Sequence, residues 1–164
     1  MIPFSPPRID QKVIDEVVDT LKSGWITTGP KTKEFERRLT AYCGNKATLA
    51  VNSNTVGLEV VLRWFGVQEG DEVIVPAYTY CATANVIVHC GAKPVMVDVN
   101  ADDFDVCLEK VREAITDKTK VIMPVDLGGM PCAYDELFEL VEAVAQKYPK
   151  YIAFDFMGRS TTYA

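Results

Sequence analysis

Residues 47–76 read ATLAVNSNTVGLEVVLRWFGVQEGDEVIVP and predict one βαβ unit. The apolar run at 47–51 is typical of a short strand, the polar residues 52–55 of a turn, and residues 72–76 (EVIVP), apolar after the first, of a second strand. Between them, residues 56–65 are mostly apolar, which is typical of a helix that other elements cover on most sides. The segment therefore predicts a helix that connects two parallel strands.

The turn of this unit, Asn52-Ser53-Asn54-Thr55, has two interpretations. It lies where a strand ends and a helix begins, and open α/β sheets bind phosphate there through the free backbone N–H groups of the helix. Asn, Ser and Thr are also the preferred N-cap residues of helices in general. The turn alone leaves both uses open, and the cap is the more common one. The sequence has neither GxGxxG nor GxxxxGK followed by Ser or Thr, so dinucleotide and P-loop sites are not indicated.

The composition is that of an ordinary globular domain. The sequence has 164 residues, 48% hydrophobic and 24% charged, so we expect one domain with a substantial core rather than a disordered chain. Seventeen basic and 23 acidic residues give a formal charge of −6, and the basic residues are scattered. This disfavours nucleic acid and anionic membranes as partners. Residues 1–10 lack a signal-peptide pattern and no apolar run approaches the ~20 residues of a membrane span, so we expect a cytoplasmic protein.

The cysteines and the single histidine do not follow the common metal or disulfide patterns. The cysteines are odd in number and widely spaced, and no CxxC motif occurs, so we expect free thiols and no metal site. His89 falls near the end of a predicted helix and is interpreted as structural. The cysteines are Cys43, Cys81, Cys90, Cys107 and Cys132.

The rest of the sequence alternates between helical and strand patterns. Asp10 is expected to cap a first helix, which Ser23 and Gly24 end. Further helices are predicted at 32–42, 80–90, 106–115 and 134–147, and further strands at 94–99, 120–125 and 151–156. Apolar strands that alternate with helices of ten or more residues are typical of βαβ crossovers. We therefore predict an α/β fold with a mostly parallel, doubly wound sheet.

In such a fold, ligands bind where the strands end. Tyr78 and Tyr80 follow the strand at 72–76, and an aromatic ring there can stack on a planar ligand or fill the groove between helix and sheet. Asp155 ends the strand predicted at 151–156, either as a helix cap or as a functional carboxylate. Both alternatives stay open for each of these residues.

Two loops also stand out. Asp126, with Gly128 and Gly129, is expected to form a turn. Residues 25–30 are rich in turn residues and carry a large aromatic. They form either a loop packed on its own domain or part of a binding or subunit surface.

Six motifs occur in order along the sequence. They are IPFSPP (2–7), SGWITTGPKTKEFE (23–36), VNSNTVGL (51–58), GDEVIVPAYTYCATANVI (70–87), GAKPVMVDV (91–99) and VDLGGMPCAYDEL (125–137). Together they resemble the PLP-dependent sugar aminotransferases of the DegT/DnrJ/EryC1/StrS family. The motifs cover most of the first ~150 residues, which makes the match specific.

The resemblance implies the large domain of a fold-type-I aminotransferase, a homodimer, and pyridoxal 5′-phosphate (PLP) as cofactor. In this family, the residues matching Asn54, Thr55 and Val56 hold the cofactor phosphate through backbone N–H groups and a hydroxyl. The aromatic matching Tyr80 stacks on the pyridine ring. The aspartate matching Asp155 pairs with the pyridinium nitrogen and keeps it protonated.

The resemblance also implies the reaction and its substrates. An amino group would pass, commonly from glutamate, to a keto group on a nucleotide-linked sugar. The segment matching Trp25, Ile26, Thr27 and Thr28 lies near the substrate and the subunit boundary. The family uses a lysine as Schiff-base partner and proton shuttle.

The sequence departs from the family pattern near its end. After the aspartate the family continues with small residues and a His or Gln, whereas residues 156–159 are Phe-Met-Gly-Arg. The sequence ends at Ala164, before the segment that carries the lysine, so we expect no catalytic lysine, no small domain, and no activity of this chain alone.

We expect a single domain in three parts. These are N-terminal helices with the substrate or dimer loop (1–45), an αβ core (46–156) and an atypical tail (157–164). Two other functions stay open. One is a non-catalytic binding or oligomerisation module that retains the fold, and the other is an unrelated nucleotide-binding α/β domain.

Overall fold

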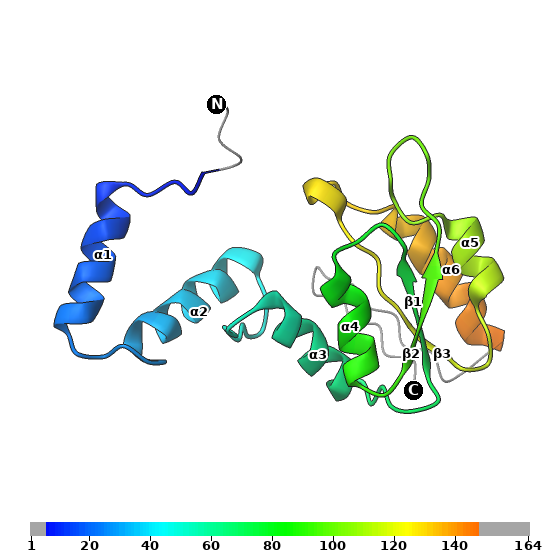
Figure 1. Cartoon of the computed structure of the whole chain (residues 1–164), viewed down its shortest axis with the longest axis horizontal. Helices are drawn as coiled ribbons and strands as arrows, with labels where there is room; N and C mark the ends of the chain where they lie inside the picture. The colour runs from blue at the N-terminus through cyan, green and yellow to red at the C-terminus, as the bar shows by residue number, and fades with distance from the viewer. Residues whose placement is uncertain (1–5, 148–164) are drawn as a thin grey trace. The chain divides into compact units, whose positions relative to one another are not determined.

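The computed structural model describes residues 6–147, with the side chains of the last helix described as far as Val144 (Figure 1). The chain divides into two compact units between Ala50 and Val51. Among residues 6–147, no helix combines the length and the apolar character needed to cross a membrane.

The first unit consists of two helices, α1 (Gln11–Lys22) and α2 (Pro30–Cys43). The Asp10 carboxylate accepts a hydrogen bond from the backbone N–H of Val13 at 3.1 Å, so the predicted cap is confirmed. Helix α2 begins two residues earlier than predicted, because Pro30 suits the first position of a helix. It ends at Gly44, which has a φ of +67° as a C-terminal glycine should.

The two helices of this unit are joined by charge rather than by a buried core. Lys31 Nζ lies 2.8 Å from a carboxylate oxygen of Glu16 and 2.8 Å from one of Asp19. Every residue of α1 and α2 is described, and none of them is buried. The apolar side of α1 is open to solvent: Val17 is 55% exposed and Leu21 is 63% exposed.

The second unit is built on three parallel strands in the order β2-β1-β3. The strands are β1 (Glu72–Pro76), β2 (Lys93–Val97) and β3 (Thr119–Ile122). The helices are α3 (Asn54–Trp64), α4 (Cys81–His89), α5 (Leu108–Ala114) and α6 (Tyr134–Lys147), and a 3-10 turn, η1, spans Leu127–Gly129.

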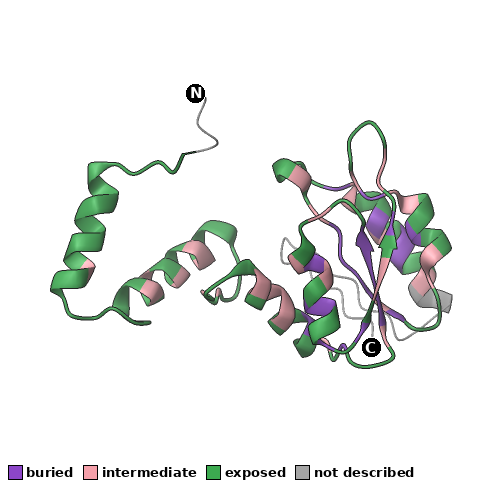
Figure 2. Ribbon diagram, in the orientation of Figure 1, coloured by how far each residue is buried: buried purple, intermediate pink, exposed green. Residues whose placement is uncertain are grey.

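The central strand β1 supplies a core on each face of the sheet. All five of its residues are buried (Figure 2). Val73 and Val75 join the core that includes residues of α3 and α4, while Ile74 joins the core that includes residues of α5 and α6. Successive strand residues point to opposite faces, which explains this alternation. Helices therefore cover both faces of a parallel sheet, as predicted for a doubly wound α/β fold.

Two of the predicted features are wrong. Residues 47–51 do not form a strand. Instead, side chains of α2 hold this segment: Glu36 accepts a hydrogen bond from the backbone N–H of Ala50 at 2.9 Å, and the hydroxyls of Thr40 and Thr48 lie 2.9 Å apart. A short apolar run becomes a strand only where a neighbouring strand supplies its hydrogen bonds.

The second correction concerns α3, which was expected to be covered on most sides. Leu62 is its one buried residue, although every residue of the helix is described. Val60 is 44% exposed and Trp64 is 84% exposed. The strand predicted at 151–156 lies outside the described residues.

Candidate functional site

The second unit contains a pocket of about 220 Å³ where the strands end. Three separate parts of the sequence form its walls. Asn54 and Leu58 come from α3, Thr83 from α4, and residues 123–126 with Tyr134 from the stretch between the end of β3 and the start of α6. The pocket therefore lies where the fold class predicts a ligand.

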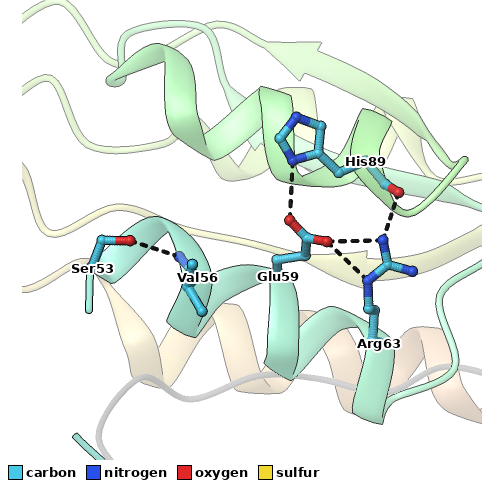
Figure 3. Close-up of polar contacts among 5 residues, drawn as sticks. All are labelled: Ser53, Val56, Glu59, Arg63 and His89. Atoms are coloured by element: carbon cyan, nitrogen blue, oxygen red, sulfur yellow. Dashed lines mark hydrogen bonds and ion pairs between the residues drawn. The ribbon is translucent and has the colours of Figure 1, made fainter. Parts of the chain in front are cut away.

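The first wall is the start of α3, and here Ser53 is the capping residue. Its backbone is extended, and its Oγ accepts a hydrogen bond from the backbone N–H of Val56 at 3.2 Å (Figure 3). Asn54 and Thr55 are the first two residues of the helix, so their N–H groups have no partner within it. These groups, together with the positive end of the helix dipole, suit an anion such as a phosphate.

The second wall is the start of α4. Thr83 is 7% exposed, and its hydroxyl lies 2.9 Å from that of Thr79. Tyr80 is the N-cap residue of α4 and is 78% exposed, so its ring is open for stacking, although it is not among the residues that line the pocket. Tyr78, in contrast, packs on Phe104 with 5.5 Å between the ring centroids.

The third wall is the loop after β3, and hydrogen bonds to Asp126 hold this loop together. One oxygen of its carboxylate accepts two hydrogen bonds, from the backbone N–H of Cys132 at 3.0 Å and from the hydroxyl of Tyr134 at 2.9 Å. Gly128 and Gly129 have φ values of +64° and +85°, which favour glycine. The predicted turn is confirmed, and its carboxylate also orients a pocket residue.

Sequence reasoning did not name six of the residues that line the pocket: Leu58, Thr83, residues 123–125 and Tyr134. Leu58 and Thr83 lie within about one turn of the first residues of their helices, so the rule that ligands bind at strand ends could have included them. Tyr134 gave no such signal, since it begins a helix eight residues after Asp126.

The buried thiol beside this site, Cys132, is not activated as a nucleophile. Cys132 is buried and its Sγ donates to the carbonyl oxygen of Val125 at 3.3 Å. Burial raises the pKa of the Cys132 thiol, and the nearby carboxylates of Asp105 and Asp126 raise it further, so the thiol stays neutral. Within residues 6–147, no three His, Cys, Asp or Glu side chains are grouped as metal ligands would be.

The loop at 25–28 belongs to the first unit and folds back on itself. The indole N–H of Trp25 donates to the carbonyl oxygen of Thr28 at 3.0 Å. Trp25 is still 56% exposed and Ile26 is 71% exposed. The loop borders a second pocket, of about 280 Å³, whose lining includes Thr27. The loop therefore packs on itself and also presents an open aromatic face. Asp155 lies outside the described residues.

Comparison with known proteins places this arrangement among aminotransferases. The model of the DegT/DnrJ/EryC1/StrS aminotransferase family matches residues 7–156. The solved structure of Spr1654 from Streptococcus pneumoniae, which is assigned as a sugar aminotransferase and is known in PLP and PMP forms, is 56% identical. It superposes with a TM-score of 0.87 over 91% of this chain and 38% of that one.

Two curated relatives are similar over nearly the whole chain. One is the uncharacterized protein MJ1066 of Methanocaldococcus jannaschii, 43% identical over 94% of this chain and 39% of that protein. The other is the spore coat polysaccharide biosynthesis protein SpsC of Bacillus subtilis, 39% identical over the same shares. The chain therefore spans about two fifths of the length of these relatives. These matches do not favour a non-catalytic module.

Proposed function

The chain belongs to the DegT/DnrJ/EryC1/StrS aminotransferase family, and we propose that the protein acts as a PLP-dependent sugar aminotransferase. The amino group passes from glutamate to a keto group on a nucleotide-linked sugar. PLP, when bound, supplies the electron sink that lets the amino group move between donor and acceptor. One observation carries the proposal: a pocket at the ends of the strands receives the starts of both α3 and α4.

The described residues fit the phosphate end of PLP. The N–H groups of Asn54 and Thr55, and the Thr55 hydroxyl, lie at the positive end of α3, where a dianion is stabilised. The N–H of Val56 is the third donor of this turn, and it already donates to the cap. The fit rests on an uncharged, donor-rich helix start that borders a cavity.

Two further residues act on the ring. Tyr80, exposed at the start of α4, stacks on the pyridine face. Asp155 holds a proton on the pyridine nitrogen, because a carboxylate beside that nitrogen raises its pKa; this role rests on the family motif alone.

The loop of Trp25, Ile26, Thr27 and Thr28 contacts the sugar substrate in this proposal. The exposed indole face of Trp25 suits a sugar ring, and the threonine hydroxyls suit its hydroxyl groups. We also propose that two copies of the protein form a homodimer and that it acts in the cytoplasm. The five described cysteines are all free thiols, which supports a reducing compartment.

A PLP titration of the purified chain tests the proposal. Absorbance follows binding, and borohydride reduction with peptide mapping separates a defined site from random reaction with surface lysines. We expect saturable binding that Tyr80→Ala and Asp155→Ala each weaken roughly tenfold, which corresponds to ~1.4 kcal/mol.

Tyr42→Ala is the matched control, because Tyr42 is an exposed tyrosine of α2 outside the proposed site, and it should bind PLP as the wild type does. Wild-type binding that does not saturate, or equal affinity in all four proteins, would contradict the proposal.

A further inference from the structure

Three side chains join α3 to the end of α4, and we refer to Glu59, Arg63 and His89 as the α3–α4 clamp (Figure 3). One carboxylate oxygen of Glu59 accepts hydrogen bonds from Arg63 Nε at 3.0 Å and Nη2 at 2.8 Å. The other oxygen lies 3.0 Å from His89 Nδ1. Arg63 Nη2 also donates to the backbone carbonyl of His89 at 2.8 Å.

The clamp is a well-formed ionic contact. The hydrogen bonds from Arg63, and then that from His89, hold the pKa of the Glu59 carboxyl below its usual range, so Glu59 stays an anion. The carbonyl of His89 belongs to the last turn of α4, where carbonyls lack partners within the helix. Arg63 therefore caps the C-terminal end of α4, and it also bonds to the Glu59 carboxylate of its own helix, α3.

The clamp adds a polar contact to the apolar packing of α3. Leu58 and Leu62 lie one turn apart and pack against the core. Glu59 and Arg63 also lie one turn apart, and each follows one of these leucines by a single residue, or about 100° around the helix. A helix that is held only along the side of Leu58 and Leu62 can rotate about its own axis. The clamp gives α3 a second line of contact with α4, which opposes that rotation.

The rotation of α3 sets the direction of the donors in the pocket. Residues near the starts of both helices, Asn54 and Thr83, line the same pocket, while Arg63 and His89, near their ends, are bonded to each other. The two helices therefore run side by side in the same direction. A contact at their far ends fixes how their starts face the pocket.

We propose that Glu59, Arg63 and His89 are positioning residues that orient the start of α3 for the phosphate of the cofactor. The inference rests on the proposed function. It assigns no contact with the ligand to the clamp: the three side chains act through the N–H groups of Asn54 and Thr55. The clamp is partly exposed, with the side chains of Arg63 and His89 each 54% exposed, so it contributes little to global stability. We therefore expect the clamp to affect the affinity for the cofactor.

The test compares PLP with pyridoxal, which lacks the phosphate, on Arg63→Met. Methionine keeps the apolar stem and removes every donor. We expect the PLP affinity to fall roughly five- to tenfold, at the lower end of measured coupling between sites, while the pyridoxal affinity stays unchanged. Arg63→Lys should restore part of the loss, because one ammonium can still reach Glu59. Arg63→Met and Glu59→Gln combined should lose no more than either alone, because both break one unit.

Arg37→Met is the matched control, because Arg37 makes the same kind of helical ion pair with Glu34 in the first unit. It should leave the PLP affinity unchanged and shift the thermal midpoint as little as Arg63→Met does. Equal losses for PLP and pyridoxal, or unchanged PLP affinity in Arg63→Met, would overturn the positioning role alone. Failure of the wild type to bind PLP would overturn the proposed function together with this inference.

Discussion

Gly29 decides where the indole of Trp25 lies. A Cβ added at Gly29 would overlap Trp25 Nε1 and Cδ1, although the backbone of Gly29 is nearly extended and suits any residue. The requirement for glycine is therefore one of space rather than of backbone conformation. Any side chain here must displace the aromatic ring.

Gly29→Ala should expel the indole from the loop. In a Trp64→Phe background, Trp25 is the remaining tryptophan, and we expect its fluorescence emission to shift to longer wavelength as water reaches the ring. Overpacking of this kind costs about 1–3 kcal/mol in a core and less at a half-exposed site. Gly57→Ala is the control, since Gly57 has no positive φ and a Cβ added there would meet nothing closer than Val51 Cγ2 at 3.6 Å. Identical spectra for the wild type and Gly29→Ala would contradict the steric argument.

Individual residues show which features of the site could be predicted from the sequence and which could not. The turn at 52–55 was interpreted as an N-cap or a phosphate site, with the cap more common, but the sequence did not indicate which polar residue caps the helix. The extended backbone of Ser53 and its hydrogen bond to Val56 identify Ser53 as the cap. Tyr78 and Tyr80 gave the same signal in the sequence. They differ because Phe104, from a distant loop, packs on the ring of Tyr78. Such contacts depend on tertiary placement, which local patterns do not carry.

At the scale of secondary-structure elements, Glu72 joins the starts of the strands. It begins β1, and its carboxylate contacts Lys93, the first residue of β2, at 3.0 Å. The other oxygen accepts a hydrogen bond of 2.6 Å from the hydroxyl of Thr116, which lies just before β3. The Thr116 hydroxyl, and then Lys93, lower the pKa of the Glu72 carboxyl from its ordinary value.

Glu72→Gln should therefore destabilise the protein in a pH-dependent way. Because the folded state lowers the pKa, the carboxylate stabilises the fold above its unfolded pKa of ~4.3 and loses this effect as the pH falls through the lower, folded value. We expect urea unfolding to show Glu72→Gln as less stable than the wild type at pH 7, with the difference shrinking at pH 3. A difference of the same size at both pH values would rule out the charge as its cause.

The elements differ in how well the sequence predicted them. The strand 72–76 was predicted correctly because its apolar run, residues 73–76, has the pattern of a central parallel strand that is buried on both faces. Residues 47–51 also form an apolar run. A strand needs a neighbouring strand to hydrogen-bond with, and an apolar pattern does not show whether such a neighbour exists. For α3 the predicted burial was wrong for another reason. An apolar sequence indicates that a helix would gain from being buried, but it does not show that other elements bury it.

For the whole molecule, the exposed apolar surface predicts self-association in solution. Val17 on α1 and Trp64 on α3 are both more than half exposed, and apolar surface of this kind favours contacts between molecules. We expect the chain to associate in a concentration-dependent manner in sedimentation experiments. Val17→Gln should weaken association severalfold, whereas Lys12→Gln, an exposed polar change on the same helix, should not. A wild type that stays monomeric at every concentration would contradict this prediction.

The alternation of side chains along β1 has a consequence for how the second unit unfolds. Val73 and Val75 belong to one core and Ile74 to the other, so neither layer of helices can lose its packing while β1 stays intact for the other. A strand shared in this way makes the two layers one cooperative unit. Heat or denaturant should then melt α3 and α4 together with α5 and α6 in a single transition, and amide hydrogens of β1 should be the last to exchange.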